Sequence, residues 1–198
     1  MDQMRKIIAS ALVAAFAVLC AVAPSAAQLA YNGTGSTTHS NSATPYTGNQ
    51  LFATNTSGSA VASPIILGGT QSGQLVVIKA LIYSNGTNKP GTSTLWLYSQ
   101  KPTTTSLVDG SAYVGPYAAD LAANIYLGSL TCSAWQVTND GTAQYFSECS
   151  GSNLMLSTVL PAPSQASQMT IFALEEIGAY TPIANEKHSY FLRTIINN

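Results

Sequence analysis

The side chains that could take part in acid–base or nucleophilic chemistry are few in this sequence and lie far apart. Its two histidines are His39 and His188, and no Gly-x-Ser-x-Gly turn occurs near either one. Glu175 and Glu176 are adjacent, so in a strand they point to opposite faces and make a poor acid–base pair. A histidine at a strand edge without nearby partners is usually solvated. The sequence therefore predicts surface histidines, no catalytic residues and no enzyme, with a hydrolase as the least favoured function.

Two acidic and two aromatic residues share one long loop-like stretch and are the candidates for a binding loop. Asp109 and Asp120 flank Tyr113 and Tyr117. Tyrosine pairs an apolar ring with a polar tip, which suits contacts with sugars and with proteins. The alternative, which is favoured, is that the tyrosines cover an end of the fold. No calcium-loop pattern and no zinc-ligand spacing occurs, so neither a metal ion nor a cofactor is expected.

A β-hairpin explains the spacing of the two cysteines outside the first twenty residues. If the Asp-Gly at 140–141 forms a type I′ turn, Cys132 lies opposite Cys149 at a pair whose side chains approach closely. We therefore expect a disulfide, which indicates an oxidising compartment. Two buried free thiols are the alternative. The same register places Trp135 opposite Phe146 on the other face.

Apolar alternation between turn residues indicates strands along most of the chain. The clearest is 74–84, which is apolar on both faces and ends at Asn-Gly, as a central strand of a sandwich would. No long amphipathic helix is predicted, only one helical turn near 118–123. About eight or nine strands without crossover helices predict an antiparallel, jelly-roll-like β-sandwich, and a barrel is less favoured. The other expected strands include 50–54, 60–67, 93–100, 124–130, 153–160, 168–176 and 188–196.

The first 27 residues are predicted to be an apolar, helical signal peptide. A short basic start precedes a long apolar run and then small residues, so cleavage is expected between Ala27 and Gln28. An uncleaved membrane anchor is the alternative.

The remaining chain divides into two predicted parts. Residues 28–50 are rich in Gly, Ser, Thr and Asn and lack apolar periodicity, which predicts a flexible polar arm. Residues 51–198 carry the strand patterns and are expected to form the β-sandwich domain.

Charge is sparse and balanced. The chain has seven Lys or Arg and eight Asp or Glu, with no run of either sign. Nucleic-acid binding needs clustered cations, and attachment to anionic lipid needs a polybasic segment. Neither nucleic acid nor, after signal cleavage, a membrane is therefore an expected partner.

Several short motifs recur in a pattern seen in a known group of proteins. A Leu-x-Leu-Tyr strand is followed by a proline, an Asp-containing loop, a Tyr-x-Gly strand and a late Gly-x-Tyr-Thr-Pro turn. This pattern resembles the small virion-associated β-sandwich proteins of tailed phages and prophages, which are decoration or minor structural proteins. The resemblance spans residues 74–196 and is carried by Leu95, Leu97, Tyr98, Pro102, Asp109, Asp120, Tyr126, Gly128, Gly178, Tyr180, Thr181 and Pro182.

The resemblance implies a non-enzymatic structural or assembly protein whose partners are proteins, as a homo-oligomer or particle component. With the predicted signal peptide, the expected location is the periplasm or the cell exterior, and a virion is the alternative. The alternative function is a secreted carbohydrate-binding or adhesin-like module that binds a surface glycan through the loop tyrosines.

Overall fold

The computed structural model describes residues 30–39, 44–54, 63–68, 74–102, 108–113, 115–138, 144–150, 154–156 and 168–197. The predicted signal peptide, with its cleavage site between Ala27 and Gln28, lies outside these residues, and so does the predicted turn at 140–141. Within the described part of the chain, no helix is both long and apolar enough to cross a membrane.

The described residues form one short helix, α2 (Ala118–Ala122), and eleven strands, of which three have only two or three residues. The strands are β1 (Ala30–Thr38), β2 (Gln50–Phe52), β3 (Ser63–Gly68), β4 (Gln74–Ser84), β5 (Ser93–Tyr98), β6 (Tyr126–Cys132), β7 (Gln136–Val137), β8 (Tyr145–Glu148), β9 (Leu154–Leu156), β10 (Gln168–Ile177) and β11 (Lys187–Asn197).

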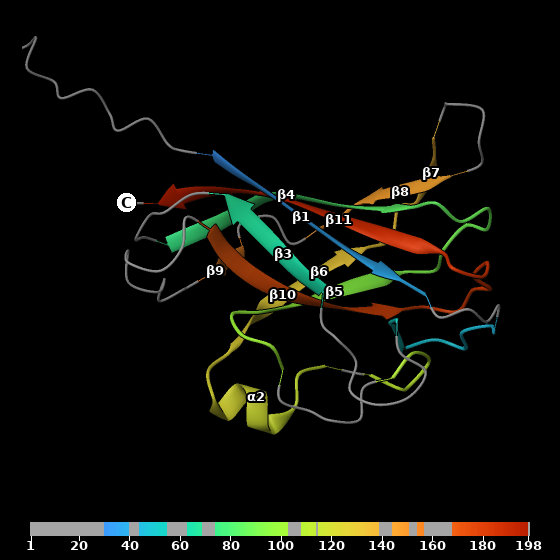
Figure 1. Cartoon of the computed structure of the whole chain (residues 1–198), viewed down its shortest axis with the longest axis horizontal. Coiled ribbons are helices and arrows are strands. Elements are labelled where there is room, and N and C mark those ends of the chain that lie inside the picture. Colours follow the sequence, from blue (N-terminus) through green and yellow to red (C-terminus); the bar gives the residue numbers. More distant parts are fainter. Residues whose placement is uncertain are drawn as a thin grey trace, which may run out of the picture.

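The strands pair antiparallel in the order β6-β5-β10-β3-β1-β11-β4-β8-β7, with β2 added to β10 and β9 added to β4. This path folds over where β3 pairs with β1, at Gly33–Leu67 and Thr34–Ile66. One layer then contains β6, β5 and β10, and the facing layer contains β11, β4 and β8 (Figure 1). The predicted all-β, antiparallel β-sandwich is confirmed.

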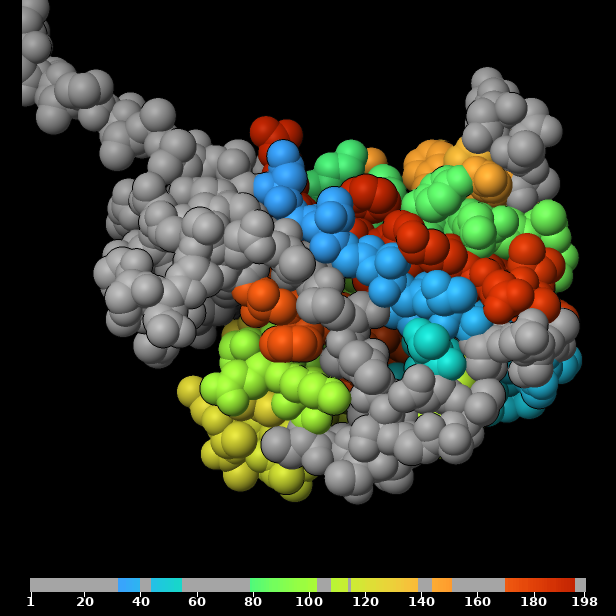
Figure 2. All heavy atoms as spheres, viewed as in Figure 1, coloured from blue at the N-terminus to red at the C-terminus, as the bar shows by residue number. Residues whose placement is uncertain are grey.

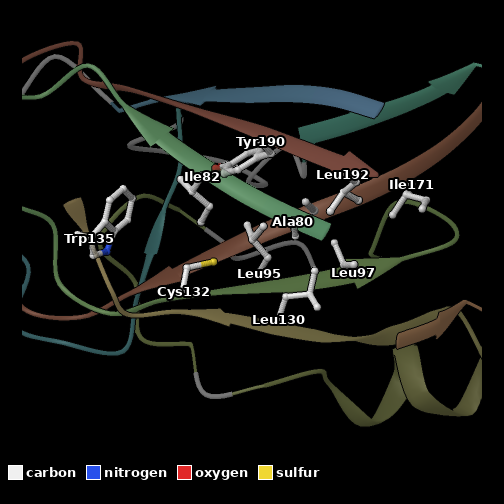
Figure 3. Packing of buried hydrophobic residues seen from close by; sticks show 11 residues of the cluster. Ala80, Ile82, Leu95, Leu97, Leu130, Cys132, Trp135, Ile171, Tyr190 and Leu192 are labelled. Atoms are coloured by element: carbon white, nitrogen blue, oxygen red, sulfur yellow. The ribbon is translucent and has the colours of Figure 1, made fainter. Parts of the chain in front are cut away.

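An apolar cluster fills much of the space between the layers (Figure 3). It forms because alternate residues of each strand point to the same face. On β4, for example, Ala80 and Ile82 are buried, while Leu81 and Tyr83 on the other face are half-buried. The cluster consists of Ala80, Ile82, Leu95, Leu97, Leu130, Cys132, Trp135, Ile171, Ala173, Tyr190 and Leu192.

A second, smaller cluster covers the outer face of β5 and β10. Residues 108–113, which precede α2, pack against that outer face. The layer is therefore enclosed on both faces (Figure 1). The pairing of residues 49–51 with residues 110–113 by backbone hydrogen bonds holds that stretch in place. The cluster consists of Leu51, Ala53, Tyr98, Tyr113, Ile125 and Leu174.

The prediction of a flexible arm over residues 28–50 is wrong for residues 30–38, which form β1. This strand pairs with β11 over its whole length, from Ala30–Ile195 to Thr38–Lys187. Its inward positions are Gly33, Gly35 and Thr37, which pair with core residues of β11. Because these side chains are absent or polar, the strand has no apolar alternation, and its backbone hydrogen bonds hold it in the sandwich.

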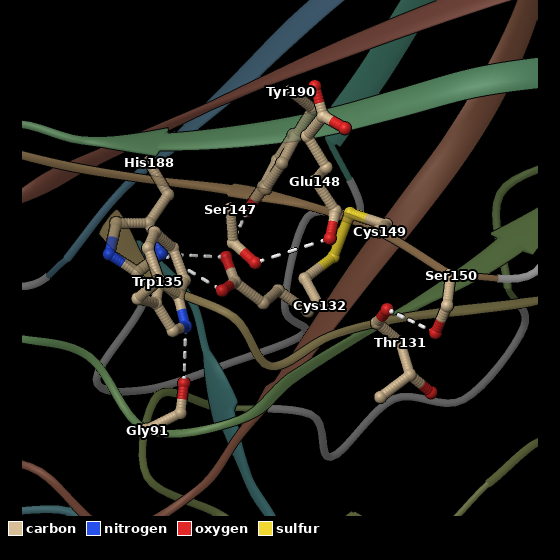
Figure 4. Close-up of a disulfide and its surroundings, with 11 residues drawn as sticks. Gly91, Thr131, Cys132, Trp135, Ser147, Glu148, Cys149, Ser150, His188 and Tyr190 are labelled. Carbon is tan, nitrogen blue, oxygen red and sulfur yellow. Dashed lines mark hydrogen bonds and ion pairs between the residues drawn. A yellow bond between two sulfur atoms is a disulfide. The ribbon is translucent and has the colours of Figure 1, made fainter. Parts of the chain in front are cut away.

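A disulfide joins Cys132 to Cys149, as predicted. Cys132 is the last residue of β6 and pairs with Ser93, whereas the Cys149 backbone N–H donates to the Ala80 carbonyl of β4. The disulfide therefore connects the two layers (Figure 4). A β-bridge between Thr131 and Ser150 lies beside it.

The predicted single hairpin is wrong in its register. Gln136 pairs with Phe146, and the Thr138 N–H donates to the Gln144 carbonyl, which shifts the pairing by one residue from the expected one. Trp135 is therefore not opposite Phe146. It is buried in the apolar cluster, where its Nε1–H donates to the Gly91 carbonyl at 2.6 Å. The irregular residues 133–135 between β6 and β7 absorb the shift.

Candidate functional site

Both histidines are buried, contrary to the prediction that they lie at the surface. His39 is 2% exposed and His188 is 0% exposed. His188 lies on β11 two residues before Tyr190, and therefore points between the layers. His39 follows the end of β1, where its backbone N–H donates to the Glu186 carbonyl at 2.7 Å. The pairing of β1 with β11 thus brings the two imidazoles into the same part of the core.

His188 lies between two buried carboxylates. Its Nδ1 is 2.9 Å from both carboxylate oxygens of Glu175 on β10, and its Nε2 is 3.1 Å from Oε1 of Glu186. The Tyr190 hydroxyl donates to the Glu175 carboxylate at 2.8 Å. Glu175 and Glu176 point to opposite faces as predicted, because the Glu176 carboxylate accepts from Trp96 on the outer face.

The Glu186 carboxylate is held by the end of β4 and by the loop that precedes β11. The Ser84 hydroxyl donates to Oε1 at 2.6 Å, and the Ile183 N–H donates to Oε2 at 3.0 Å. Gly86 makes room for this carboxylate, since a Cβ there would lie 2.3 Å from the carboxylate carbon. The glycine of the predicted Asn-Gly turn thus leaves space for Glu186, but neither Asn85 nor Gly86 has the positive φ that such a turn requires.

A second histidine–carboxylate pair lies close by. The Nε2 of His39 is 2.9 Å from Oδ2 of Asp109, and the Tyr46 hydroxyl donates to Oδ1 at 2.5 Å. The Ala53 N–H also donates to Oδ1, at 3.1 Å. Asp109 reaches this position because its loop pairs with residues 49–51.

Phe52 of β2 separates the two histidines. Its ring stacks on His188 with 3.9 Å between centroids and 8° between planes, and its centroid lies 5.6 Å from that of His39. We call this group of residues the polar cluster: His39, Tyr46, Phe52, Ser84, Asp109, Glu175, Glu186, His188 and Tyr190.

The carboxylates determine the charge of the cluster. Burial lowers the pKa of His188, but the charges and hydrogen bonds of Glu175 and Glu186 outweigh it and raise that pKa to about 9. Burial raises the pKa of Glu186, but hydrogen bonds from His188 and Ser84 bring it below its ordinary value. Burial, together with Asp109 for Tyr46 and Glu175 for Tyr190, raises the pKa of both hydroxyls well above the ordinary range. His188 is thus an imidazolium at neutral pH, held between carboxylates.

This arrangement suits a structural role. Both ring nitrogens of His188 are engaged, one face of the ring is stacked on Phe52, and the side chain is not accessible to solvent. A general base needs a free nitrogen within hydrogen-bond reach of a substrate. The carboxylates approach His188 from different sides, and among the described residues no group of three or more His, Cys, Asp or Glu is arranged to hold a metal ion.

The predicted binding-loop residues do not form an exposed site together. Tyr113 is 1% exposed and lies in the second apolar cluster, and Asp120 is buried as well. Asp109 points inward to His39. Only Tyr117 is exposed, at 37%, with its ring packed edge-on against Tyr113. Tyr113 packs over the outer face of β5, whereas the favoured interpretation placed the loop tyrosines over an end of the fold.

The sequence analysis missed the polar cluster because its members lie far apart in the chain. One signal was available. On β11, His188 occupies the same face as Tyr190 and Leu192, and on β10, Glu175 occupies the same face as Ile171 and Ala173. A charged residue in phase with an apolar face indicates a buried charge, which requires a partner.

Comparisons with protein-family models, with curated proteins and with solved structures found no match to this chain.

Proposed function

We propose that this chain is a non-enzymatic structural protein that works through contacts with other protein subunits, as the phage-like resemblance implies. The observation that carries the proposal is the closure of the polar cluster. The side chains of His188, Glu175 and Glu186, which could otherwise do chemistry, contact one another and join β10, β11 and the loop before β11. What the chain offers to other molecules is therefore its surface.

The outer face of β11 and β4 is the surface best suited to subunit contacts. Figure 2 shows β1, β11 and β4 side by side on one side of the molecule. Phe191, on the outward side of β11, is 43% exposed and pairs with Thr34 and Leu81. Tyr83 and Phe146 form the next cross-strand pair on the same face, and both are half-buried.

This face combines apolar residues with a charged rim, as protein interfaces do. The Lys79 ammonium lies 2.5 Å from the Glu148 carboxylate, and both side chains are more than half exposed. Arg193 pairs with Lys79 across β11 and β4 and is also exposed. Both signs of charge are present on one face, which allows two copies of the same surface to complement each other.

The disulfide supports export as part of the proposal. Disulfides persist in oxidising compartments, and the predicted signal peptide would direct the chain to one. The proposed location is the periplasm or the cell exterior.

Sedimentation of the purified, disulfide-bonded protein tests the proposal. We expect a concentration-dependent oligomer that Phe191→Ser weakens by about ten-fold or more in Kd, since the phenyl ring lies at the centre of the apolar patch. Leu121→Ser is the matched control, because Leu121 is 53% exposed but lies on α2. A wild-type protein that stays monomeric at all concentrations would contradict the proposal, and so would equal effects of the two variants.

A further inference from the structure

The outer face of β5 and β6 carries a partly exposed pair of aromatic residues. Trp96 of β5 and Tyr126 of β6 are both half-buried. Their ring centroids are 6.0 Å apart, and the ring planes are inclined by 39°. Both residues pack against the second cluster and are partly exposed.

A β-bulge places Tyr126 beside Trp96. Leu97 pairs with Gly128, whereas the next residue of β5, Tyr98, pairs with Tyr126, so that Leu127 is the extra residue. Without the bulge, Tyr126 would lie on the same face as Gly128 and point between the layers. Gly128 has φ +142°, a conformation that glycine adopts without strain. Bulges that redirect a side chain are common beside binding sites.

The Trp96 ring is held in place before any ligand arrives. Its Nε1–H donates to the Glu176 carboxylate at 2.9 Å. Its ring meets Tyr113 edge-on, with 5.9 Å between centroids and 77° between planes. A Cβ at Gly115 would lie 3.4 Å from the far edge of the indole, so the loop before α2 packs closely against it. A ring fixed in this way loses little conformational entropy on binding.

Polar side chains lie in the adjacent row of the same face. Glu176, Thr94 and Thr131 pair across β10, β5 and β6, one row away from Trp96. Ser129 pairs directly with Trp96. The surface therefore offers two aromatic faces, a carboxylate and several hydroxyls side by side.

We infer that this face, which we call the Trp96 platform (Trp96, Tyr126, Glu176, Thr94, Thr131 and Ser129), binds neutral saccharides. A pyranose ring presents C–H groups that pack on aromatic faces, and its hydroxyls exchange hydrogen bonds with carboxylates and with Ser or Thr. Glu176 is the one charged residue of the platform, so acidic sugars such as sialic acid are disfavoured by like-charge repulsion.

The inference goes beyond the proposed subunit contacts, because the platform and the Phe191 face lie on different layers. It also moves the sugar site away from the binding loop that the sequence indicated, where Tyr113 and Asp120 are buried. A particle subunit with this arrangement would contact its neighbours through one layer and present a sugar-binding surface on the other.

The test is binding to soluble cellotetraose, lactose and mannobiose, with sialyllactose as the acidic comparison. Tryptophan fluorescence reports the site, because the chain has two tryptophans and Trp135 is buried in the core. We expect at least one neutral sugar to shift the emission and bind more tightly than sialyllactose. Because Trp96→Phe removes the reporting fluorophore, its binding is measured by calorimetry and should be weaker than that of the wild type, while the Trp135 emission reports an intact fold.

Two arginine variants serve as a matched pair that leaves the core untouched. Thr131→Arg places a long side chain over the platform and should weaken sugar binding about ten-fold or more, while oligomerisation is retained. Thr34→Arg, at another exposed threonine, beside Phe191, should leave sugar binding within about two-fold and weaken oligomerisation.

The inference is overturned if no neutral sugar binds, if sialyllactose binds best, or if Thr131→Arg and Trp96→Phe bind as the wild type does. Loss of oligomers in the wild type, with sugar binding intact, would overturn the proposed function and leave this inference standing.

Discussion

The two parts of the space between the layers are stabilised in different ways. The apolar cluster consists of alternating Leu, Ile, Ala and aromatic residues, closed at one side by the disulfide. The polar cluster holds histidine and carboxylate side chains from four separate segments of the chain, at His39, Asp109, Glu175 and residues 186–188. Apolar packing degrades gradually as groups are removed, whereas a buried ionic network loses much of its stability when one partner is lost.

The difference implies that the polar cluster specifies how the loops close the end of the sandwich. Its hydrogen bonds have direction, and they connect β1, β2, β10 and β11 with the loop that contains Asp109. Apolar contacts tolerate small shifts of register, but a buried carboxylate without its hydrogen bonds is costly. The apolar cluster accordingly stabilises the packing of the two layers. The polar cluster fixes how the loops are arranged at the end of the sandwich.

The largest effect is expected for His188→Ala. The variant leaves Glu175 and Glu186 buried together without the imidazolium, which should lower the free energy of unfolding by about 3–5 kcal/mol. Urea unfolding measures it. Lys187→Ala, at the exposed neighbouring position, is the control and should change stability by less than about 0.5 kcal/mol. Equal stability of the two variants would show that the network contributes nothing.

A somewhat smaller effect is expected from reduction of the disulfide beside the apolar cluster. Reduction should lower the free energy of unfolding by about 3 kcal/mol, given the sequence separation of 17 residues. Hydrogen exchange should increase first in β6 and β8, which the disulfide joins across the layers. The double variant Cys132→Ala/Cys149→Ala is the control, since reductant should not affect it. Unchanged stability after reduction, with free thiols demonstrated, would refute this role.

The smallest effect is expected in the dependence of stability on pH. This dependence should come from the polar cluster and not from the apolar cluster. The pKa of His188 is raised in the folded state, so its contribution is complete below about pH 6.5 and is lost as pH rises through about 9. The pKa of Glu186 is lowered, so its contribution is complete above its ordinary value of 4.5 and is lost at more acid pH.

Stability should therefore be greatest between about pH 4.5 and pH 6.5, and it should decline as pH rises from about 6.5 to about 9. The alkaline decline should disappear in His188→Ala, while Leu97→Ala, in the apolar cluster, should be less stable at every pH without changing the shape of the curve. A curve of the same shape for wild type and His188→Ala would contradict this assignment.

The sequence was sufficient to predict the part of the fold that depends on local periodicity. Alternation on residues 74–84 and 93–98 predicted two core strands, and the spacing of Cys132 and Cys149 predicted their disulfide. It failed for β1, because inward glycines leave no apolar pattern. It also failed for the pairing of Trp135, because the irregular residues after β6 shift the register by one.

The polar cluster could not be predicted for a different reason. His39, Asp109 and His188 come together only through long-range pairing of β1 with β11 and of residues 49–51 with the loop that follows β5. No pattern of neighbouring residues in the sequence predicts such long-range pairings. The Trp96 platform has the same origin, since the bulge at Gly128 decides on which face Tyr126 lies.

The most direct test of the central proposal, that His188 serves the fold, is NMR observation of its imidazole across pH. We expect an imidazolium at pH 7 whose two N–H groups are protected from solvent exchange and which loses its proton only near pH 9. A neutral, solvent-exchanging ring that titrates near 6.5 would contradict the claim, because a histidine with a free nitrogen at neutral pH is available for general base chemistry.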